Sequence, residues 1–338
     1  MAAILAIESS CDETAASICI DGNIVSNIVA TQKVHEMYGG VVPELASRAH
    51  IENIVPVVEA ALLEAFSHQS GNFSLQNNID AIAFTQAPGL MGSLLVGTQF
   101  AKSLALALQK PLIAVHHMQA HVLANLIDDT NKPEFPFLCL TVSGGHTQIV
   151  LAKSPLDLQI IGQTIDDAAG EAFDKAAKIL GLPYPGGPLI DKYATMGNAL
   201  AYKFAEPQIP DLNFSFSGVK TSILYFLQKQ EPSFIQNNLH DLCASIQHTI
   251  VKILLKKLAT AAQETGVKNI CIAGGVSANS GLRSTLQELG LSKKWKTFIP
   301  KFEYCTDNAA MIAITGHYKY LAKDFVGLEV SPNARGGF

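Results

Sequence analysis

Apolar runs of two lengths alternate along the chain. Short runs such as 3–8 and 136–142 predict buried strands, whereas the apolar spacing over 43–66 predicts a helix. Further strands are expected at 15–20, 24–30, 79–87, 112–115, 146–153, 269–275 and 296–300, and further helices at 93–109, 166–181, 238–265, 277–289 and from about 307. This alternation predicts an α/β fold with mixed sheets.

One local pattern occurs twice. Segment 3–20 reads as an apolar strand, a small polar turn and a second apolar strand, and segment 136–153 repeats that order. We interpret the repetition as an internal duplication that gives two similar lobes, each beginning with a β-hairpin.

Composition and charge limit the class of protein. The chain has 338 residues, of which 48% are hydrophobic and 16% charged, enough for a large core. Its net charge of −5 excludes a broadly basic surface, so nucleic acid would need a local basic patch or a partner. Scattered cysteines without a C-x-x-C pair, and no signal peptide or transmembrane run, predict a cytoplasmic protein with reduced thiols.

Three histidines fall within "VHHMQAH" (115–121). His117 and His121 are four residues apart, so a helix would place both on one face, close enough to hold one metal ion. No Glu follows His117, and the H-E-x-x-H peptidase motif is therefore incomplete. Asp307 is the best third ligand, Cys305 is a weaker one, and simple packing of the two histidines is the alternative.

Glycine-rich turns follow several predicted strands. "TVSGGHT" (141–147), "YPGGP" (184–188) and "IAGGVSANS" (272–280) could cradle a phosphate with backbone N–H groups. In the last of these, a helix N-terminus and the Asn279 amide would stand at the end of a strand, where α/β folds bind nucleotides. Each turn taken alone is also compatible with an ordinary connection.

Charged residues near these turns are further candidates. Asp12, Asp174 and Asp191 could bind ribose hydroxyls, amines or a cation, or could simply cap helices. The densest basic cluster combines 293–296 ("KKWK") with Lys252, Lys256 and Lys257 and could contact nucleic acid or merely be solvated.

Eight motifs, in order, resemble the universal tRNA N(6)-adenosine threonylcarbamoyltransferase family of the bacterial TsaD type. The resemblance covers essentially the whole chain and is carried by "ESSCDET", "VHHMQAH", "TVSGGHTQIV", "IDDAAGEAFDKAAK", "YPGGP", "FSFSGVKT", "GGVSAN" and "CTDNAAMIA". It implies the actin/Hsp70/sugar-kinase (ASKHA) fold, with a nucleotide cleft between two duplicated lobes. We expect the first lobe at 1–130 plus 308–338 and the second at 131–307.

The resemblance also implies an activity and a site. The expected reaction moves a threonylcarbamoyl group from threonylcarbamoyl-AMP to N6 of the adenosine 3′ of the anticodon, in tRNAs reading codons that begin with A. The implied ligands of one divalent metal ion, iron or zinc, are His117, His121 and Asp307. The implied nucleotide-binding residues, for threonylcarbamoyl-AMP or ATP, ADP and AMP, are Thr141, Val142, Ser143, Gly144, Gly145, Asp174, Gly187, Asp191 and Asn279.

The resemblance further implies partner proteins and no membrane. Besides tRNA, the expected partners are a paralogue that lacks the metal site (TsaB type) and a small P-loop ATPase (TsaE type). Asp12 is our own candidate for the proton acceptor, from its place in the first hairpin turn. The alternatives are a sugar-kinase-like phosphotransferase, which would not need the His–His–Asp set, and a non-catalytic nucleotide-dependent chaperone or scaffold.

Overall fold

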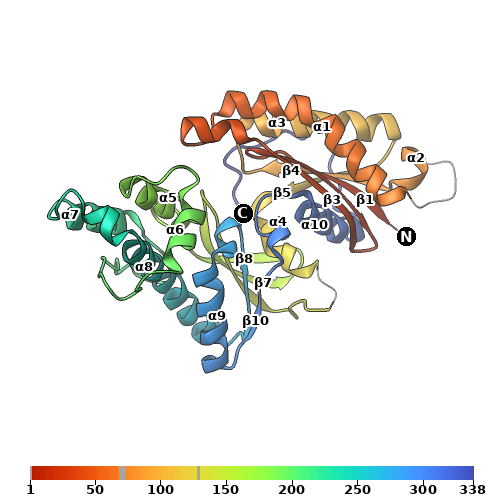
Figure 1. Cartoon of the computed structure of the whole chain (residues 1–338). Helices are drawn as coiled ribbons and strands as arrows, with labels where there is room; N and C mark the ends of the chain where they lie inside the picture. Colours follow the sequence, from red (N-terminus) through yellow and green to blue (C-terminus); the bar gives the residue numbers. More distant parts are fainter. Residues whose placement is uncertain (1, 68–73, 128–129) are drawn as a thin grey trace. The chain divides into compact units, whose positions relative to one another are not determined.

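A computed structural model describes residues 2–67, 74–127 and 130–338 of the chain (Figure 1). These residues form two compact units, each built on one five-stranded sheet. The first unit comprises Met1–Lys132, Ser154–Asp157 and Lys301–Phe338, and the second comprises Pro133–Lys153 and Leu158–Pro300.

The first unit has the strand order β3-β2-β1-β4-β5. Its strands are β1 (Ala3–Glu8), β2 (Glu13–Ile20), β3 (Asn23–Thr31), β4 (Ala81–Ala87) and β5 (Leu112–His116). β1, β2 and β3 form an antiparallel meander, whereas β4 runs parallel to β1 and β5 parallel to β4. The central strand β1 is buried along its whole length.

Helices cover both faces of this sheet. They are η1 (Lys33–Tyr38), α1 (Pro43–Phe66), α2 (Leu75–Asn78), α3 (Met91–Leu108), α4 (His117–Leu123), η2 (Ala124–Leu126), η4 (Phe302–Tyr304) and α10 (Ala309–Leu321). Leu5 and Ile82 pack with apolar residues of α1 and α3, while Ile4 and Ala83 meet Gly316 of α10. Because neighbouring strand residues point to opposite faces, α10 lies on the face opposite α1 and α3 (Figure 1).

The second unit has the strand order β10-β9-β6-β7-β8. Its strands are β6 (Phe137–Val142), β7 (Thr147–Ser154), β8 (Asp157–Gln163), β9 (Asn269–Ala273) and β10 (Lys296–Phe298). Its helices are α5 (Ala169–Ile179), α6 (Gly186–Ala194), α7 (Ser217–Leu227), α8 (Phe234–Thr265), η3 (Gly275–Ala278) and α9 (Ser280–Lys293). Leu138 and Leu140 pack with Phe173 of α5 and Ile250 of α8 in its core.

The two sheets share one topology. In each, an antiparallel hairpin leads to a third strand at one edge, and the later strands add in parallel on the other side of the first strand. The α/β class and the duplication predicted from the two hairpins are therefore confirmed.

Some elements differ from the predictions. The edge strand β8 lies outside the predicted strands, because its polar–apolar alternation holds over 157–160 only and is interrupted by Ile161 and Gly162. α7 begins inside a stretch expected to be irregular, and α6 begins at Gly186, so "YPGGP" enters a helix. α8 starts at Phe234, before the predicted 238, with a local break at Asn238, where φ is −126°.

α3 is the one helix in the described residues that is long and apolar enough to cross a membrane by length and composition. Core helices of soluble proteins pass the same test. Its buried residues, among them Leu94 and Ala101, lie along the helix at a spacing that turns them to the sheet. α3 is therefore explained as a packing helix of the first unit.

Candidate functional site

The two histidines predicted as metal ligands lie on one face of α4. β5 ends at His116 and α4 begins at His117, so the strand places the helix at the carboxyl edge of the first sheet. The rings of His117 and His121 are buried, with centroids 4.7 Å apart and planes at 88°. Their Nε2 atoms are 3.1 Å apart. The predicted helical spacing is confirmed, and the Nε2 atoms of both rings converge on the same point.

Asp307 reaches the same place from the other end of the chain. Its Oδ1 lies 3.2 Å from Nε2 of His121 and 3.3 Å from Nε2 of His117. The next residue, Asn308, caps α10 by accepting a hydrogen bond from the backbone N–H of Met311 at 3.0 Å. This cap fixes the start of α10 and with it the position of Asp307.

The three side chains form a donor set that fits a metal ion. One ligand atom from each lies within 4.8 Å of the others. Two imidazole nitrogens and one carboxylate oxygen suit Fe²⁺ or Zn²⁺, and three protein ligands leave positions for a substrate. Without a cation, the facing lone pairs would need a proton between them.

The charges of the group agree with this description. Burial opposes a charge on His117, yet Asp307 and Glu8 raise its pKa well above the usual histidine value. Burial likewise opposes ionisation of Asp307, but His117 and His121 hold its pKa below its usual range. Burial lowers the pKa of His121, and the neighbouring His117 adds to the effect. Without metal, these neighbours therefore favour a protonated His117 ring beside an ionised Asp307.

Cys305, the weaker candidate ligand, has another partner. It is buried, and its thiol donates a hydrogen bond to the backbone carbonyl of Lys301 at 3.4 Å. In the described ranges, the converging group of His117, His121 and Asp307 does not include this sulfur.

Sequence analysis did not single out Glu8, which contacts the histidine pair. This fully buried carboxylate ends β1, and its Oε2 lies 3.0 Å from Nδ1 of His117. An acidic residue that ends an otherwise apolar strand is a signal that could have found it, because a buried charge requires a partner.

Asp12 lies in the turn between β1 and β2, as predicted. The carbonyl oxygen of the preceding Cys11 accepts hydrogen bonds from His50 Nε2 at 3.0 Å and Ser93 Oγ at 3.2 Å. The next residue, Glu13, has its pKa raised to about 9 by burial and by the negative charges of Asp307 and Asp12. Hydrogen bonds to the Cys11 carbonyl thus fix the turn, and Glu13 lies close enough to Asp307 for the two carboxyl groups to interact electrostatically.

In the second unit, the predicted phosphate turn connects β6 and β7. The N–H of Ser143 donates to the carbonyl of His146 at 2.8 Å, and the N–H of His146 donates to Ser143 Oγ at 3.1 Å. Gly144 and Gly145 are exposed, and a Cβ on either would meet nothing within 4 Å. At Gly170, in the first turn of α5, a Cβ would lie 2.5 Å from Ser143 O. Glycine therefore keeps the tip of the turn open and lets α5 approach it.

The turn that follows β9 approaches the same strand end and leads through η3 to α9. Gly274 has φ +84°, and a Cβ there would lie 2.4 Å from the carbonyl oxygen of Val142. Asn279 caps α9 by accepting from the N–H of Leu282 at 2.9 Å, and its amide donates to Gln247 at 2.7 Å. Asn279 thus organises the helix N-terminus expected to receive the nucleotide.

The two acidic candidates of this unit also cap helices. Asp174 accepts hydrogen bonds from the N–H groups of Gly186 at 2.8 Å and Gly187 at 3.1 Å, at the start of α6. Burial raises the pKa of Asp174 although these N–H groups oppose the shift. Asp191 accepts from both the N–H (3.0 Å) and the hydroxyl (2.6 Å) of Ser280, at the start of α9. Contact of these residues with a nucleotide stays a prediction.

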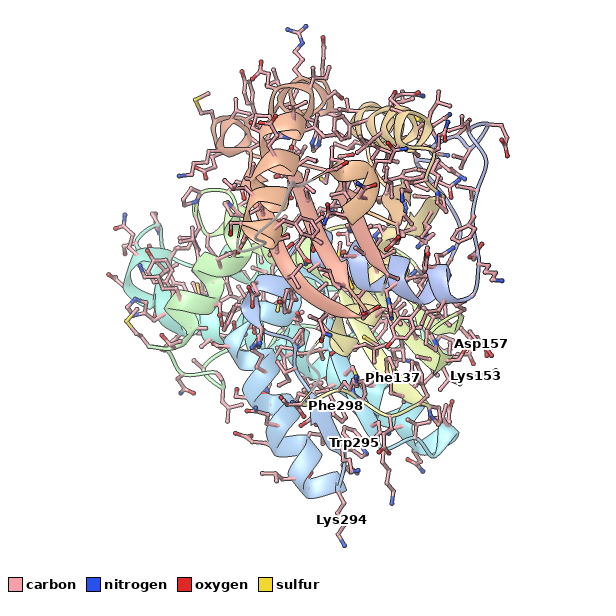
Figure 2. The ribbon with its side chains drawn as sticks, turned by 90° about the vertical axis from the view of Figure 1, so that its right-hand side faces the viewer. Phe137, Lys153, Asp157, Lys294, Trp295 and Phe298 are labelled. Carbon is pink, nitrogen blue, oxygen red and sulfur yellow. The ribbon has the colours of Figure 1, made fainter. Side chains whose placement is uncertain are left out.

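The predicted basic cluster separates into two kinds of lysine. Lys252 pairs with Glu206 at 2.6 Å, and Lys257 donates to the carbonyl of Ile209 at 2.6 Å, so both contact the segment before α7. The lysines that follow α9 are exposed, and Figure 2 shows Lys294 extending away from the ribbon. Lys256 of the predicted cluster is exposed on α8. Lys268, which the prediction did not include, is exposed beside Lys296, and we call Lys268, Lys293, Lys294 and Lys296 the lysine edge. β9 pairs with β10 there, and Lys296 donates its N–H to the carbonyl of Lys268 at 2.9 Å.

Close relatives share nearly the whole chain. A protein of Christiangramia forsetii named tRNA N6-adenosine threonylcarbamoyltransferase is 60% identical over 98% of this chain and 97% of its own length. Proteins with the same name from Porphyromonas gingivalis and Geotalea uraniireducens are 54% and 50% identical, over 98% and 96% of this chain and 97% and 92% of their own lengths.

Solved structures show the same fold at low identity. HypF of T. kodakarensis has a TM-score of 0.66 and 14% identity, covering 95% of this chain and 48% of that protein. Component A of (R)-2-hydroxyglutaryl-CoA dehydratase from Acidaminococcus fermentans has a TM-score of 0.53 and 17% identity, covering 95% of this chain and all of that one. The chain therefore has the ASKHA fold. Residues 23–314 match the family model of the TsaD tRNA N6-adenosine threonylcarbamoyltransferases, and the chain belongs to that family.

Proposed function

We propose that this protein transfers the threonylcarbamoyl group from threonylcarbamoyl-AMP to N6 of the adenosine 3′ of the anticodon, in tRNAs that read codons beginning with A. The observation that carries the proposal is the convergence of His117, His121 and Asp307 in a chain that is 50–60% identical to relatives bearing this activity in their names. A sugar-kinase-like phosphotransferase has no need for such a donor set.

The proposed reaction exchanges one bond to the carbamoyl carbon for another. The N6–C bond forms, the bond from that carbon to the phosphate oxygen breaks, AMP leaves, and N6 loses one proton. The donor is already an activated mixed anhydride, so no enzyme nucleophile is needed. The catalytic problem is the poor nucleophilicity of an adenine amine and the ready hydrolysis of the donor.

We propose that His117, His121 and Asp307 hold one Fe²⁺ or Zn²⁺ ion. When bound, the ion supplies Lewis acidity toward the carbamoyl oxygen. His117 and His121 are buried, and Asp307 is partly exposed, so the proposed site would be open to substrate on the side of Asp307.

The second unit provides the proposed nucleotide contacts. In the turn 143–145, the N–H of Ser143 is bonded to His146, so the proposed donors to the phosphate are the N–H groups of Gly144 and Gly145 at the open tip. The ends of β6 and β9 support this turn. Thr141, Val142, Asp174, Gly187, Asp191 and Asn279 complete the proposed contacts with the adenosine part.

Asp12 is the proposed acceptor of the N6 proton, and the lysine edge is a proposed contact for the tRNA backbone. The acceptor base has to leave its stack, and a single-stranded anticodon loop makes this less costly than a duplex would. The net charge of −5 fits an enzyme that shares tRNA contacts with other proteins. The proposed partners are a metal-site-lacking paralogue and a small P-loop ATPase, and the proposed location is the cytoplasm.

The direct test incubates this protein and its proposed partners with threonine, bicarbonate, ATP and unmodified tRNA. Mass spectrometry of the digested nucleosides should then show threonylcarbamoyladenosine. A reaction without this protein controls for carry-over from the partners. Unmodified adenosine throughout, with folded protein and intact donor, would reject the proposal.

A further inference from the structure

Glu8 is a buried carboxylate whose two oxygens are both engaged. It is 0% exposed and ends the central strand of the first sheet. The backbone N–H of Ser10 donates to Oε1 at 2.5 Å, and the hydroxyl of Thr85, on the parallel strand β4, donates to Oε2 at 2.6 Å. Nδ1 of His117 lies 3.0 Å from the same Oε2. The carboxylate therefore links the end of β1, the strand β4 and the proposed ligand His117.

We infer that Glu8 is a positioning residue that holds His117 in the tautomer with the proton on Nδ1. Oε1 faces a backbone N–H, which can only donate, and Oε2 receives the Thr85 hydroxyl. A carboxylate in this setting accepts hydrogen bonds, so Nδ1 of His117 must carry the hydrogen. In the neutral form of the ring that can bind a metal, Nε2 is then free of a proton and turns its lone pair toward His121 and Asp307. This inference rests on the proposed metal site.

The hydroxyl of Ser10 supports the same orientation. Its Oγ lies 3.1 Å from Nδ1 of His117 and can accept a bifurcated hydrogen bond from the same N–H group. Glu8 and Ser10 belong to the segment that ends β1, while His117 follows β5. The ring is therefore held from across the sheet rather than by its own helix.

The second histidine has no such support. Nδ1 of His121 is buried and has no hydrogen-bond partner among the residues that the structure describes. No hydrogen bond in the described residues therefore holds Nδ1 of His121, whereas Nδ1 of His117 faces the carboxylate of Glu8. Carboxylate partners of this type typically change metal affinity by about 10- to 100-fold when removed. This difference between the two histidines predicts that Glu8 raises metal affinity by orienting His117 and not by acting on His121.

Glutamine cannot replace this carboxylate. The site needs an acceptor at Oε1 for the Ser10 N–H and an acceptor at Oε2 for both Thr85 and His117. An amide has only one oxygen, so its NH₂ group would face a donor on one side whichever way it turned. Glu8→Gln keeps the volume of the side chain while removing its function as a double acceptor.

The test measures Zn²⁺ affinity of the metal-depleted full-length protein by competition with a chelator, without tRNA or partners. Glu8→Gln should bind Zn²⁺ about 10- to 100-fold more weakly than the parent. Glu52→Gln, the same change at an exposed position of α1, should bind like the parent. Equal affinities of Glu8→Gln and the parent would overturn the inference, whether or not the protein modifies tRNA.

A second measurement keeps the inference testable if Glu8→Gln does not fold. The parent protein labelled with ¹⁵N-histidine and loaded with Zn²⁺ should show Nδ1 of His117 as a protonated nitrogen and Nε2 as the coordinating one. A His117→Gln sample assigns the resonances by their loss. A protonated Nε2 on His117 would contradict the role of Glu8. Zn²⁺ binding with this tautomer but without tRNA product would leave the inference standing and reject the proposed activity alone.

Discussion

Oδ1 of Asp307 lies 3.2 Å from Nε2 of His121, although 186 residues separate the two in sequence. The connection depends on two helix starts, because α4 follows β5 directly and α10 is capped by Asn308. Both ligands are therefore placed by helix starts, and substitution of a ligand side chain can change metal binding without changing the backbone that places it.

His121→Ala should remove the bound metal and leave the protein folded. The substitution removes one of the three proposed metal ligands. Nδ1 of His121 has no hydrogen-bond partner in the described residues, so no group loses a bond to that nitrogen. Metal analysis of the purified protein should fall from one ion per chain toward none, with an unchanged circular dichroism spectrum. Retention of one tightly bound ion would show that His121 is not a ligand.

His117→Ala should cost more stability than His121→Ala in the metal-free protein. His117 is the cationic partner of Glu8 at 3.0 Å and of Asp307 at 3.3 Å, and its loss leaves the buried charge of Glu8 without this partner. Breaking a buried pair of this kind costs about 3–5 kcal/mol. Urea unfolding of both variants checks the order, and a smaller loss for His117→Ala would contradict the described charges.

Metal affinity should rise with pH beyond the usual titration range of histidine. The proposed ion would bind a bare Nε2. Burial opposes a charge on His117, yet Asp307 and Glu8 raise its pKa well above 6.5 in the metal-free protein. Below that raised pKa, Zn²⁺ must displace one proton, so its affinity should increase about tenfold per pH unit. Chelator competition between pH 6 and pH 8 measures this slope. A plateau starting near pH 6.5 would indicate an ordinary histidine.

Gly274→Ala should destabilise the second unit, whereas Gly275→Ala should not. At Gly274, φ is +84° and a new Cβ would lie 2.4 Å from Val142 O, while a Cβ on Gly275 meets nothing within 4 Å. An alanine forced into such a backbone conformation costs roughly 1–3 kcal/mol even without a clash. Thermal unfolding compares the two variants, and equal midpoints would contradict the described contact.

Asp12→Asn should slow transfer without removing metal. If Asp12 accepts the N6 proton, an amide of the same shape cannot do so, and the rate should fall by about 100-fold or more. Single-turnover formation of modified tRNA measures the step, and metal analysis serves as the control. A normal transfer rate would discard Asp12 as the proton acceptor.

Lys294→Ala combined with Lys296→Ala should weaken tRNA binding and its salt dependence. Each lysine that neutralises a phosphate contributes about one unit to the slope of log affinity against log salt, so the double variant should lose about two. Lys229→Ala, at an exposed position after α7, is the control for a simple change of charge. An unchanged slope would show that the lysine edge is merely solvated.

Local patterns in the sequence were sufficient for much of this structure. The spacing of His117 and His121 is a property of one helix turn, and the hairpins that reveal the duplication are contiguous segments. Asp307 was found through its motif and its place before a helix, and the structure brings it to the histidines.

Contacts between distant segments could not be found in this way. Glu8 meets His117 only because β1, β4 and β5 pair in one sheet. Similarly, Asp166 holds the start of α7 by accepting from the hydroxyl of Ser215 and the N–H of Phe216, so a stretch that reads as irregular becomes a helix. Such partners depend on register and topology, which single-sequence periodicity does not contain.

The most direct test of the central claim compares the parent protein with a variant carrying both His117→Ala and His121→Ala. Each is purified, analysed for metal, and incubated with partners, threonine, bicarbonate, ATP and unmodified tRNA before nucleoside mass spectrometry. We expect threonylcarbamoyladenosine from the parent and only background from the folded, metal-free double variant. Parent-level product from that double variant would contradict a catalytic metal centre built by these histidines and Asp307.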